Sequence, residues 1–174
     1  MHTVAPAFAA PRGEQVYAAS RLHGDMASCL FCDRLRSPSA IPGGAIYEDD
    51  LVHASHYMDE ETEYLGYLLI QTKRHAAGVA ELTDEEAQAV GLTATRLARA
   101  LKAVVGAEKV YTYVFGEKVP HFHCLVVARY RGVPEEYWRL NLGDWPEAPR
   151  GNAEAVAELA RRLRRTLESA SYSA

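Results

Sequence analysis

The clearest pattern of hydrophobic positions lies between residues 87 and 104, where apolar side chains recur every three or four residues. This spacing predicts a long helix with one apolar face. The sequence from Thr83 to Glu86 is a capping-box pattern that marks the start of this helix, and Gly106 marks its end. A second helix is predicted over residues 152–167, close to the C-terminus.

Strand-like segments outnumber these helices. They are bounded by turn residues, and they cover residues 45–47, 51–57, 65–72, 109–115 and 122–130. Few of the connections between them are suited to parallel crossovers. The pattern therefore predicts an α+β fold with an antiparallel β-sheet and one long helix, followed by a C-terminal helix.

Three regions are expected along the chain. Residues 1–20 are rich in Ala and Pro and lack periodicity, which is typical of a mobile N-terminal tail. Residues 21–133 carry the predicted strands and the long helix, so we expect them to form the folded domain. Residues 134–174 are expected to form a C-terminal extension that ends in the terminal helix.

Composition narrows the class of protein. The chain has 19 Lys and Arg against 23 Asp and Glu, a net charge of −4 and a pI of about 6.0, which argues against a protein that coats nucleic acid. A mononucleotide ligand is still compatible, because a few backbone N–H groups and one or two cations can hold a phosphate. No apolar run approaches the roughly 18 residues of a membrane span, and no signal-peptide pattern is present. We therefore expect a cytoplasmic protein with no nucleic-acid or membrane partner.

The cysteines suggest metal chemistry. Cys29 and Cys32 have the Cys-x-x-Cys spacing that often supplies half of a tetrahedral zinc site. Two other interpretations stay open at this point: a thioredoxin-like redox pair, or two buried and inert cysteines. The redox motif normally begins a helix in a βαβ pattern, which the predicted elements do not show.

The histidines cluster near one predicted strand. On that strand His121, His123 and Leu125 share a face, and the two histidines lie about 7 Å apart, so both can serve one site. A chance pair on a half-buried strand is the alternative. His75 follows the strand 65–72, and a histidine at that place is usually a solvated loop residue.

Together, the order of these elements resembles the histidine-triad (HIT) superfamily, which contains nucleotide-binding hydrolases and a uridylyltransferase. The resemblance runs from about Cys29 to Tyr130. It implies a HIT-like fold over residues 21–133. It also implies a structural zinc ion, whose ligands would be Cys29, Cys32, His75 and His121. His123 falls at the position of the family's nucleophile.

The resemblance also indicates where a purine nucleotide or nucleotide conjugate would bind. Gly116 matches the glycine before the motif, where a backbone N–H can approach a phosphate, and Lys118 can pair with the phosphate as a cation. Asp59 is the candidate for the aspartate that holds ribose hydroxyls. His53 and His56 lie on opposite faces of their strand, and His56 is the better candidate for lining a base pocket.

One position departs from the family pattern: Leu125 replaces the third histidine, and leucine can neither donate nor accept a proton. Two interpretations follow. In the first, the protein hydrolyses or transfers nucleotidyl groups through a nucleotidyl-His123 intermediate, acting on phosphoramidates, dinucleoside polyphosphates or nucleotide sugars. In the second, it is a catalytically silent, zinc-stapled nucleotide-binding module.

A homodimer is also implied by the resemblance. Relatives pair through the long helix and the adjacent strand, and some place a C-terminal tryptophan near the partner's site. Trp145, followed by Pro146, is the corresponding candidate in this chain.

Overall fold

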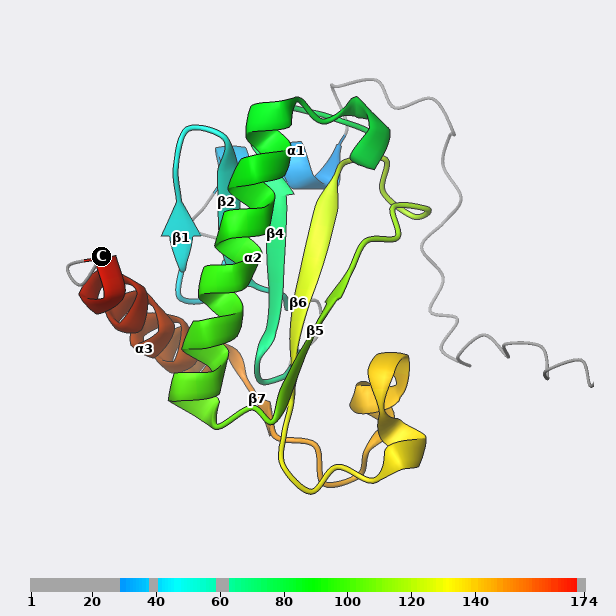
Figure 1. Ribbon diagram of the computed structural model, residues 1–174, viewed down its shortest axis with the longest axis vertical. Coiled ribbons are helices and arrows are strands. Elements are labelled where there is room, and N and C mark those ends of the chain that lie inside the picture. Colours follow the sequence, from blue (N-terminus) through cyan, green and yellow to red (C-terminus); the bar gives the residue numbers. More distant parts are fainter. Residues whose placement is uncertain (1–28, 38–40, 59–62, 172–174) are drawn as a thin grey trace, which may run out of the picture.

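The computed structural model describes residues 29–37, 41–58 and 63–171 (Figure 1). The predicted tail over residues 1–20 and the candidate ribose ligand Asp59 lie outside these ranges. The helices and strands are α1 (Leu30–Arg36), β1 (Tyr47–Glu48), β2 (Val52–His56), β3 (Glu63–Tyr64), β4 (Tyr67–Thr72), α2 (Asp84–Val105), β5 (Lys109–Tyr113), β6 (His123–Arg129), β7 (Arg150–Gly151) and α3 (Ala153–Ser171). Three 3₁₀ helices, η3 (Val79–Glu81), η4 (Glu135–Tyr137) and η5 (Arg139–Asp144), complete the described elements.

The main sheet has five strands in the order β1-β2-β4-β6-β5, and each neighbouring pair is antiparallel. The predicted α+β class with an antiparallel sheet is therefore confirmed. The two-residue strands β3 and β7 form a separate antiparallel ribbon that the sequence pattern did not indicate. Segments this short carry no detectable alternation, so only pairing with a distant partner reveals them.

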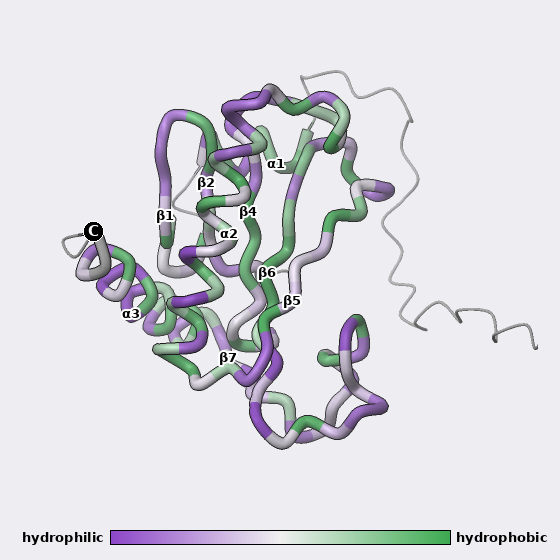
Figure 2. Tube along the Cα trace, viewed as in Figure 1, coloured by the Kyte–Doolittle hydropathy of each residue, from purple (hydrophilic) through white to green (hydrophobic). Residues whose placement is uncertain are grey.

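One face of the sheet is covered by α2, which runs along it, with α3 packed beside α2 (Figure 1). The strands contribute Val52, Ala54, Leu68, Ile70, Val126 and Ala128 to this core. Leu97 and Leu101 from α2 and Leu163 from α3 fill the space opposite them. In Figure 2, hydrophobic colours are concentrated on β4 and β6, while α3 alternates between the two extremes. We call this side the helix-covered face.

The other side, which we call the His123 face, carries Leu69, Leu125 and Val127, in addition to His123 itself. Phe31 of α1 packs near one end of β6. At the other end Arg129 stacks on Trp138, with its guanidinium carbon 4.2 Å from the ring centroid. The C-terminal extension therefore folds back onto the sheet.

The ends of α2 agree with the sequence prediction. Thr83 accepts a hydrogen bond from the backbone N–H of Glu86 (3.2 Å), and the Glu86 carboxylate accepts one from the backbone N–H of Thr83 (2.9 Å). Gly106 ends the helix with a φ of 67°, a left-handed conformation that favours glycine.

In the described residues, no helix is both long and apolar enough to cross a membrane.

The start of α2 also holds the loop that follows β4. The buried Glu86 carboxylate accepts two hydrogen bonds from the Arg74 guanidinium, at 2.9 and 2.6 Å. This contact with Arg74 lowers the pKa of Glu86 from its usual range. Because Arg74 is next to His75, the helix start fixes the backbone that presents this histidine.

The capping box gives a stability prediction. Thr83→Ala removes the side-chain acceptor for the Glu86 N–H and should lower the free energy of unfolding by about 1 kcal/mol. Thr83→Ser keeps the hydroxyl, so its free energy of unfolding should stay within about a few tenths of a kcal/mol of the wild-type value. Urea denaturation of both variants measures the difference, and equal losses would show that the hydroxyl is not the stabilising group.

Candidate zinc centre and active site

Four potential metal ligands come together from three separate parts of the chain. Cys29 precedes α1, Cys32 lies in it, His75 follows β4, and His121 precedes β6. One ligand atom from each lies within 4.8 Å of the other three. The structure thus brings together all four residues that the sequence predicted as zinc ligands.

The distances within this cluster fit a tetrahedral ion. The Sγ atoms of Cys29 and Cys32 both lie 3.4 Å from His121 Nδ1, and Cys32 Sγ lies 3.5 Å from His75 Nδ1. Zinc bonds of about 2.3 Å to sulfur and about 2.0 Å to nitrogen, at tetrahedral angles, separate the two atoms by about 3.5 Å. The donor set is also the one that structural zinc sites use.

The protonation of His121 is consistent with a metal cation bound by this cluster. The Nε2 atom of His121 lies 2.8 Å from the Thr72 carbonyl oxygen, which can only accept, so Nε2 carries the proton and Nδ1 keeps its lone pair for a metal. Burial lowers the pKa of His121 and so keeps its ring neutral. Burial, followed by the neighbouring Cys29, raises the pKa of Cys32; a bound cation reverses that effect by stabilising the thiolates. Cys29, Cys32, His75 and His121 therefore fit a structural zinc ion.

His123 is oriented by a member of this cluster. Its Nδ1 atom lies 2.8 Å from the backbone carbonyl oxygen of His121, so Nδ1–H donates and the neutral ring has its lone pair on Nε2. The Phe31 ring packs against the imidazole with centroids 4.8 Å apart. A half-buried imidazole with this tautomer is suited to act as a nucleophile.

Leu125 is on the same face, two residues further along β6. Its side chain is 8% exposed and packs in an apolar cluster with Leu69 and Val127. It pairs across the sheet with Leu69 on one side and with Tyr113 on the other. The position therefore offers no proton donor, as the sequence indicated.

Gly116 and Lys118 lie in the loop between β5 and β6, which leads directly to His121 and His123. Gly116 has a φ of 85°, a backbone conformation that residues other than glycine rarely adopt. Lys118 is exposed. Both remain candidates for phosphate binding.

His56 is not brought to this site. It lies on the helix-covered face, is only 2% exposed, and both ring nitrogens have backbone partners: the Tyr57 carbonyl accepts from Nδ1 (2.6 Å) and the Gly66 N–H donates to Nε2 (3.1 Å). Burial lowers the pKa of His56 to about 4, so the ring is neutral. We correct the expectation that it lines a base pocket: its role here is structural.

The His123 face instead holds residues that sequence reasoning did not select. His53 pairs with Gln71, and Gln71 pairs with His123, so these three residues form a row across β2, β4 and β6. Gln71 also donates to the Phe31 carbonyl at 3.2 Å. Alternation along β2 separated His53 from His56, but only the strand register shows which of them shares a face with His123.

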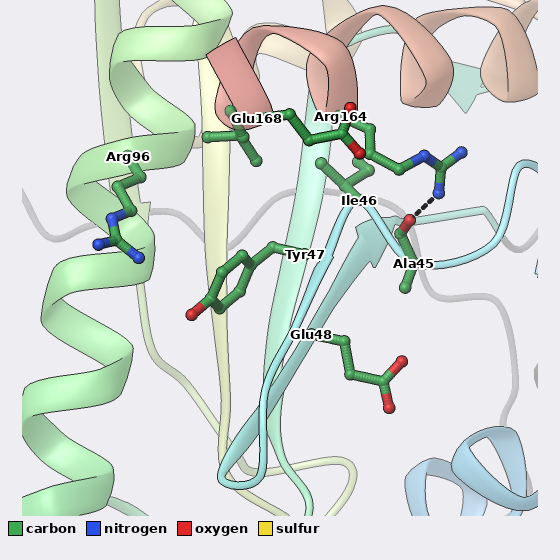
Figure 3. Close-up of a pocket in the computed structure, with 8 residues that line it drawn as sticks. Ala45, Ile46, Tyr47, Glu48, Arg96, Arg164 and Glu168 are labelled. Atoms are coloured by element: carbon green, nitrogen blue, oxygen red, sulfur yellow. Dashed lines mark hydrogen bonds between the residues drawn. The ribbon is translucent and has the colours of Figure 1, made fainter. Parts of the chain in front are cut away.

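A separate pocket of about 410 Å³ lies between β1, α2 and α3 (Figure 3). Arg164 reaches into its rim and donates to the Ala45 carbonyl, while Arg96 faces the Tyr47 ring. None of the sequence-predicted site residues lines it. The hydrogen bond from Arg164 to the Ala45 carbonyl connects α3 to the segment just before β1.

The fold and the site define a class: a small α+β protein with a metal-binding Cys₂His₂ cluster beside a carbonyl-held histidine. A comparison with protein families matches residues 39–132 to the HIT domain. This match covers more than half of the chain, and the protein belongs to the HIT domain family. The resemblance seen in the sequence is thereby confirmed.

Individual relatives agree. The chain is 32% identical to an uncharacterised HIT-like protein of Mycoplasma genitalium over 108 residues, covering 59% of this chain and 74% of that protein. It is 26% identical to protein hit of Bacillus subtilis over 140 residues, covering 75% and 93% of the two chains. The crystal structure of a zinc-bound histidine triad family protein from Mycobacterium smegmatis matches with a TM-score of 0.63 and 22% identity, covering 86% of this chain and 100% of that one. This last match shows a shared fold.

The cluster geometry predicts one zinc ion per chain in freshly purified, untagged protein, measured by elemental analysis. Cys32→Ser should lower the zinc content, whereas Cys124→Ala should retain it because Cys124 lies on the helix-covered face. Acidification should release the metal, since protonation competes for the thiolates, and release should lower the unfolding temperature. A zinc-free protein of undiminished stability would contradict the assignment.

Proposed function

We propose that this protein is a nucleotide-binding hydrolase or nucleotidyltransferase that works through a covalent nucleotidyl-His123 intermediate. The observation that carries the proposal is the hydrogen bond from His123 Nδ1 to the His121 carbonyl, which leaves the lone pair on Nε2 free to act as a nucleophile. Family membership supports it, because the second motif histidine is the nucleophile in HIT enzymes.

The proposed reaction has two steps. In the first, His123 Nε2 attacks the α-phosphorus of a purine nucleotide conjugate, an N–P bond forms, and the bond to the leaving group breaks with its electron pair going to the leaving atom. In the second, water or another acceptor attacks the same phosphorus and loses its proton to solvent or to a released base. The N–P bond breaks, and its electron pair returns to Nε2, which restores neutral His123. Hydrolysis and transfer differ only in that acceptor.

The other candidate residues have supporting roles in this proposal. The Gly116 N–H and the Lys118 ammonium would contact phosphate oxygens, and Asp59 would hold the ribose hydroxyls. Zinc held by two sulfurs and two nitrogens has no open position, so it would stabilise the structure rather than activate water. Cys29 and Cys32 must stay reduced to bind it, which supports a cytoplasmic location.

One observation favours a second candidate, the catalytically silent nucleotide-binding module. Leu125 is enclosed in an apolar cluster, at the place where the family has its third histidine. A site without a general acid can bind a nucleotide without turning over poor leaving groups. The two candidates are distinguished by whether His123 becomes covalently nucleotidylated, which mass spectrometry detects.

The leucine leads to a prediction about leaving groups. A nucleotide p-nitrophenyl ester, whose leaving group departs without a proton, should be cleaved, whereas an alkyl phosphoramidate should be cleaved weakly because its amine needs an acid. Leu125→His should speed cleavage of the phosphoramidate by about 10- to 100-fold and that of the ester by less. His123→Ala should abolish both reactions in a steady-state assay.

Two results would contradict this account. Brisk cleavage of alkyl phosphoramidates by wild type would show that another residue supplies the acid. Failure to cleave even the activated ester, with nucleotide binding intact, would favour the silent module.

We also propose a homodimer formed through α2 and β5. Within the described residues β5 pairs with β6 alone, so its outer edge presents unpaired backbone groups. Leu92 of α2 is 51% exposed, and Phe115, just after β5, is 50% exposed. Trp145 packs against the apolar cluster of its own chain, and a role at a partner's site is not part of this proposal.

The dimer is tested by light scattering at micromolar concentration, where wild type should have twice the chain mass. Leu92→Glu should weaken association because it places a charge in an apolar contact. Leu140→Glu is a control for a charge placed at an exposed leucine outside α2 and β5, since Leu140 is 39% exposed and belongs to η5. A monomeric wild type would refute the proposal.

A further inference from the structure

The imidazole of His123 has an aromatic neighbour to which the proposed mechanism assigns no role. The centroid of the Phe31 ring lies 4.8 Å from that of the His123 ring, and the two planes meet at 60°. The same ring makes a T-shaped contact with the His121 imidazole, at a centroid distance of 5.8 Å. Phe31 is buried, with 4% of its surface exposed. It therefore contacts both the proposed nucleophile and the histidine whose carbonyl orients it.

The backbone of Phe31 is held in place by its surroundings. Cys29 and Cys32, on either side of it in sequence, belong to the metal-binding cluster. The side-chain amide of Gln71 in β4 donates a hydrogen bond to the Phe31 carbonyl oxygen at 3.2 Å. Gln71 is also the direct cross-strand partner of His123. One side chain thus joins the strand beside the nucleophile to the segment that carries its aromatic neighbour.

A buried glutamine at this place needs an explanation. Gln71 is 2% exposed, and the preceding residue of β4 on the same face is Leu69. Burying an amide costs free energy unless it is hydrogen-bonded, whereas an apolar side chain of similar length would fill the space without that cost. The bond to the Phe31 carbonyl offsets the cost. Its structural consequence is a fixed distance between α1 and the strand that carries His123.

Attack by His123 changes the charge on its ring. Nε2 uses its lone pair to form the N–P bond, while Nδ1 keeps the proton that it donates to the His121 carbonyl, so the neutral imidazole becomes an imidazolium. The face of an aromatic ring is negative and attracts a cation within about 6 Å of its centroid. Phe31 meets this distance condition. Its attraction to the His123 ring is therefore stronger after the attack than before it.

Arg34 also approaches the Phe31 ring. Its guanidinium carbon lies 5.8 Å from the Phe31 centroid and 5.9 Å from that of Tyr57. This charge is present both before and after the attack, whereas the charge on His123 arises only during the reaction. A comparison between variants at position 31 that keep Arg34 therefore isolates the contribution of the ring.

We propose that Phe31 stabilises the nucleotidyl-imidazolium form of His123 by a cation–π interaction, and that Gln71 is a positioning residue that holds Phe31 at the required distance. The inference rests on the proposed function, because the cationic ring forms only if His123 is nucleotidylated. In the second step the electron pair of the N–P bond returns to Nε2 and the ring becomes neutral again. The interaction therefore speeds formation of the intermediate and slows its breakdown.

Two measurements separate these steps. Stopped-flow release of p-nitrophenolate from the nucleotide p-nitrophenyl ester reports formation of the covalent adduct, and mass spectrometry after removal of the ester reports its breakdown. Phe31→Leu should slow formation and speed breakdown, so that the ratio of the two rate constants falls by about 3- to 30-fold. A substitution that only displaced the His123 ring would slow both steps.

Fluorinated phenylalanines at position 31 test the electrostatics at nearly constant size. Each added fluorine weakens the negative face of the ring, so the ratio should fall steadily from phenylalanine through its mono-, di- and trifluorinated forms. A packing role predicts no such trend. The same replacements at Phe122 are the matched control, because Phe122 is also buried, at 3% exposure, but lies on the helix-covered face. They should leave the ratio unchanged.

Gln71→Met removes the amide donor at similar volume and should lower the same ratio by about threefold. In the Phe31→Leu background it should add little, because Gln71 acts through Phe31. Elemental analysis should find the wild-type zinc content in each variant. If Phe31→Leu loses zinc, the fluorinated series decides the outcome, since it keeps the shape of the ring.

Parallel slowing of both steps in Phe31→Leu, or a fluorinated series without a trend, would overturn the role of Phe31 and leave the proposed function intact. Absence of a His123 adduct in wild type would reject the proposed function, and the cation–π interaction with it. An undiminished effect of Gln71→Met in the Phe31→Leu background would show that Gln71 does not act through the aromatic ring.

Discussion

The site depends on the position of one residue, His121. Its Nδ1 atom lies 3.4 Å from both cysteine sulfurs, its Nε2 atom bonds the Thr72 carbonyl, and its own carbonyl holds the ring of His123. The first two contacts fix the backbone at the start of β6. The third contact holds the His123 ring in a fixed orientation relative to that backbone. Anything that loosens the cluster therefore also disturbs the tautomer and direction of His123.

The remainder of the fold supplies the rigidity that this arrangement needs. The cluster joins α1, the end of β4 and the start of β6, which are far apart in sequence. On the helix-covered face, α2 packs on the same strands, and the Glu86–Arg74 contact ties the helix start to the segment that carries His75. Hydrophobic packing on one face and polar contacts on the other thus hold the same two strands.

The His123 face is chemically divided along β6. At one end lie the Cys₂His₂ cluster and the carbonyl-held imidazole; further along lie Leu125, Tyr113 and the aromatic residues of the C-terminal extension. Because Leu125 can neither give nor take a proton, this position supplies no general acid or base.

Local signals in the sequence predicted α2, α3 and the main strands, and the resemblance to the HIT superfamily indicated the four cluster residues. The capping box at Thr83 and the glycine at 106 define the ends of α2 through contacts within a few residues. The Cys-x-x-Cys motif and the motif histidines can be recognised from their order and spacing along the chain. Only the tertiary structure decided which strand faces meet. The pairing of β2, β4 and β6 puts His53 rather than His56 on the same face as His123, with Gln71 between them, and the pairing of β5 with β6 sets Tyr113 against Leu125. The reason is that alternation separates the two faces of one strand, whereas register between strands depends on contacts across the whole sheet.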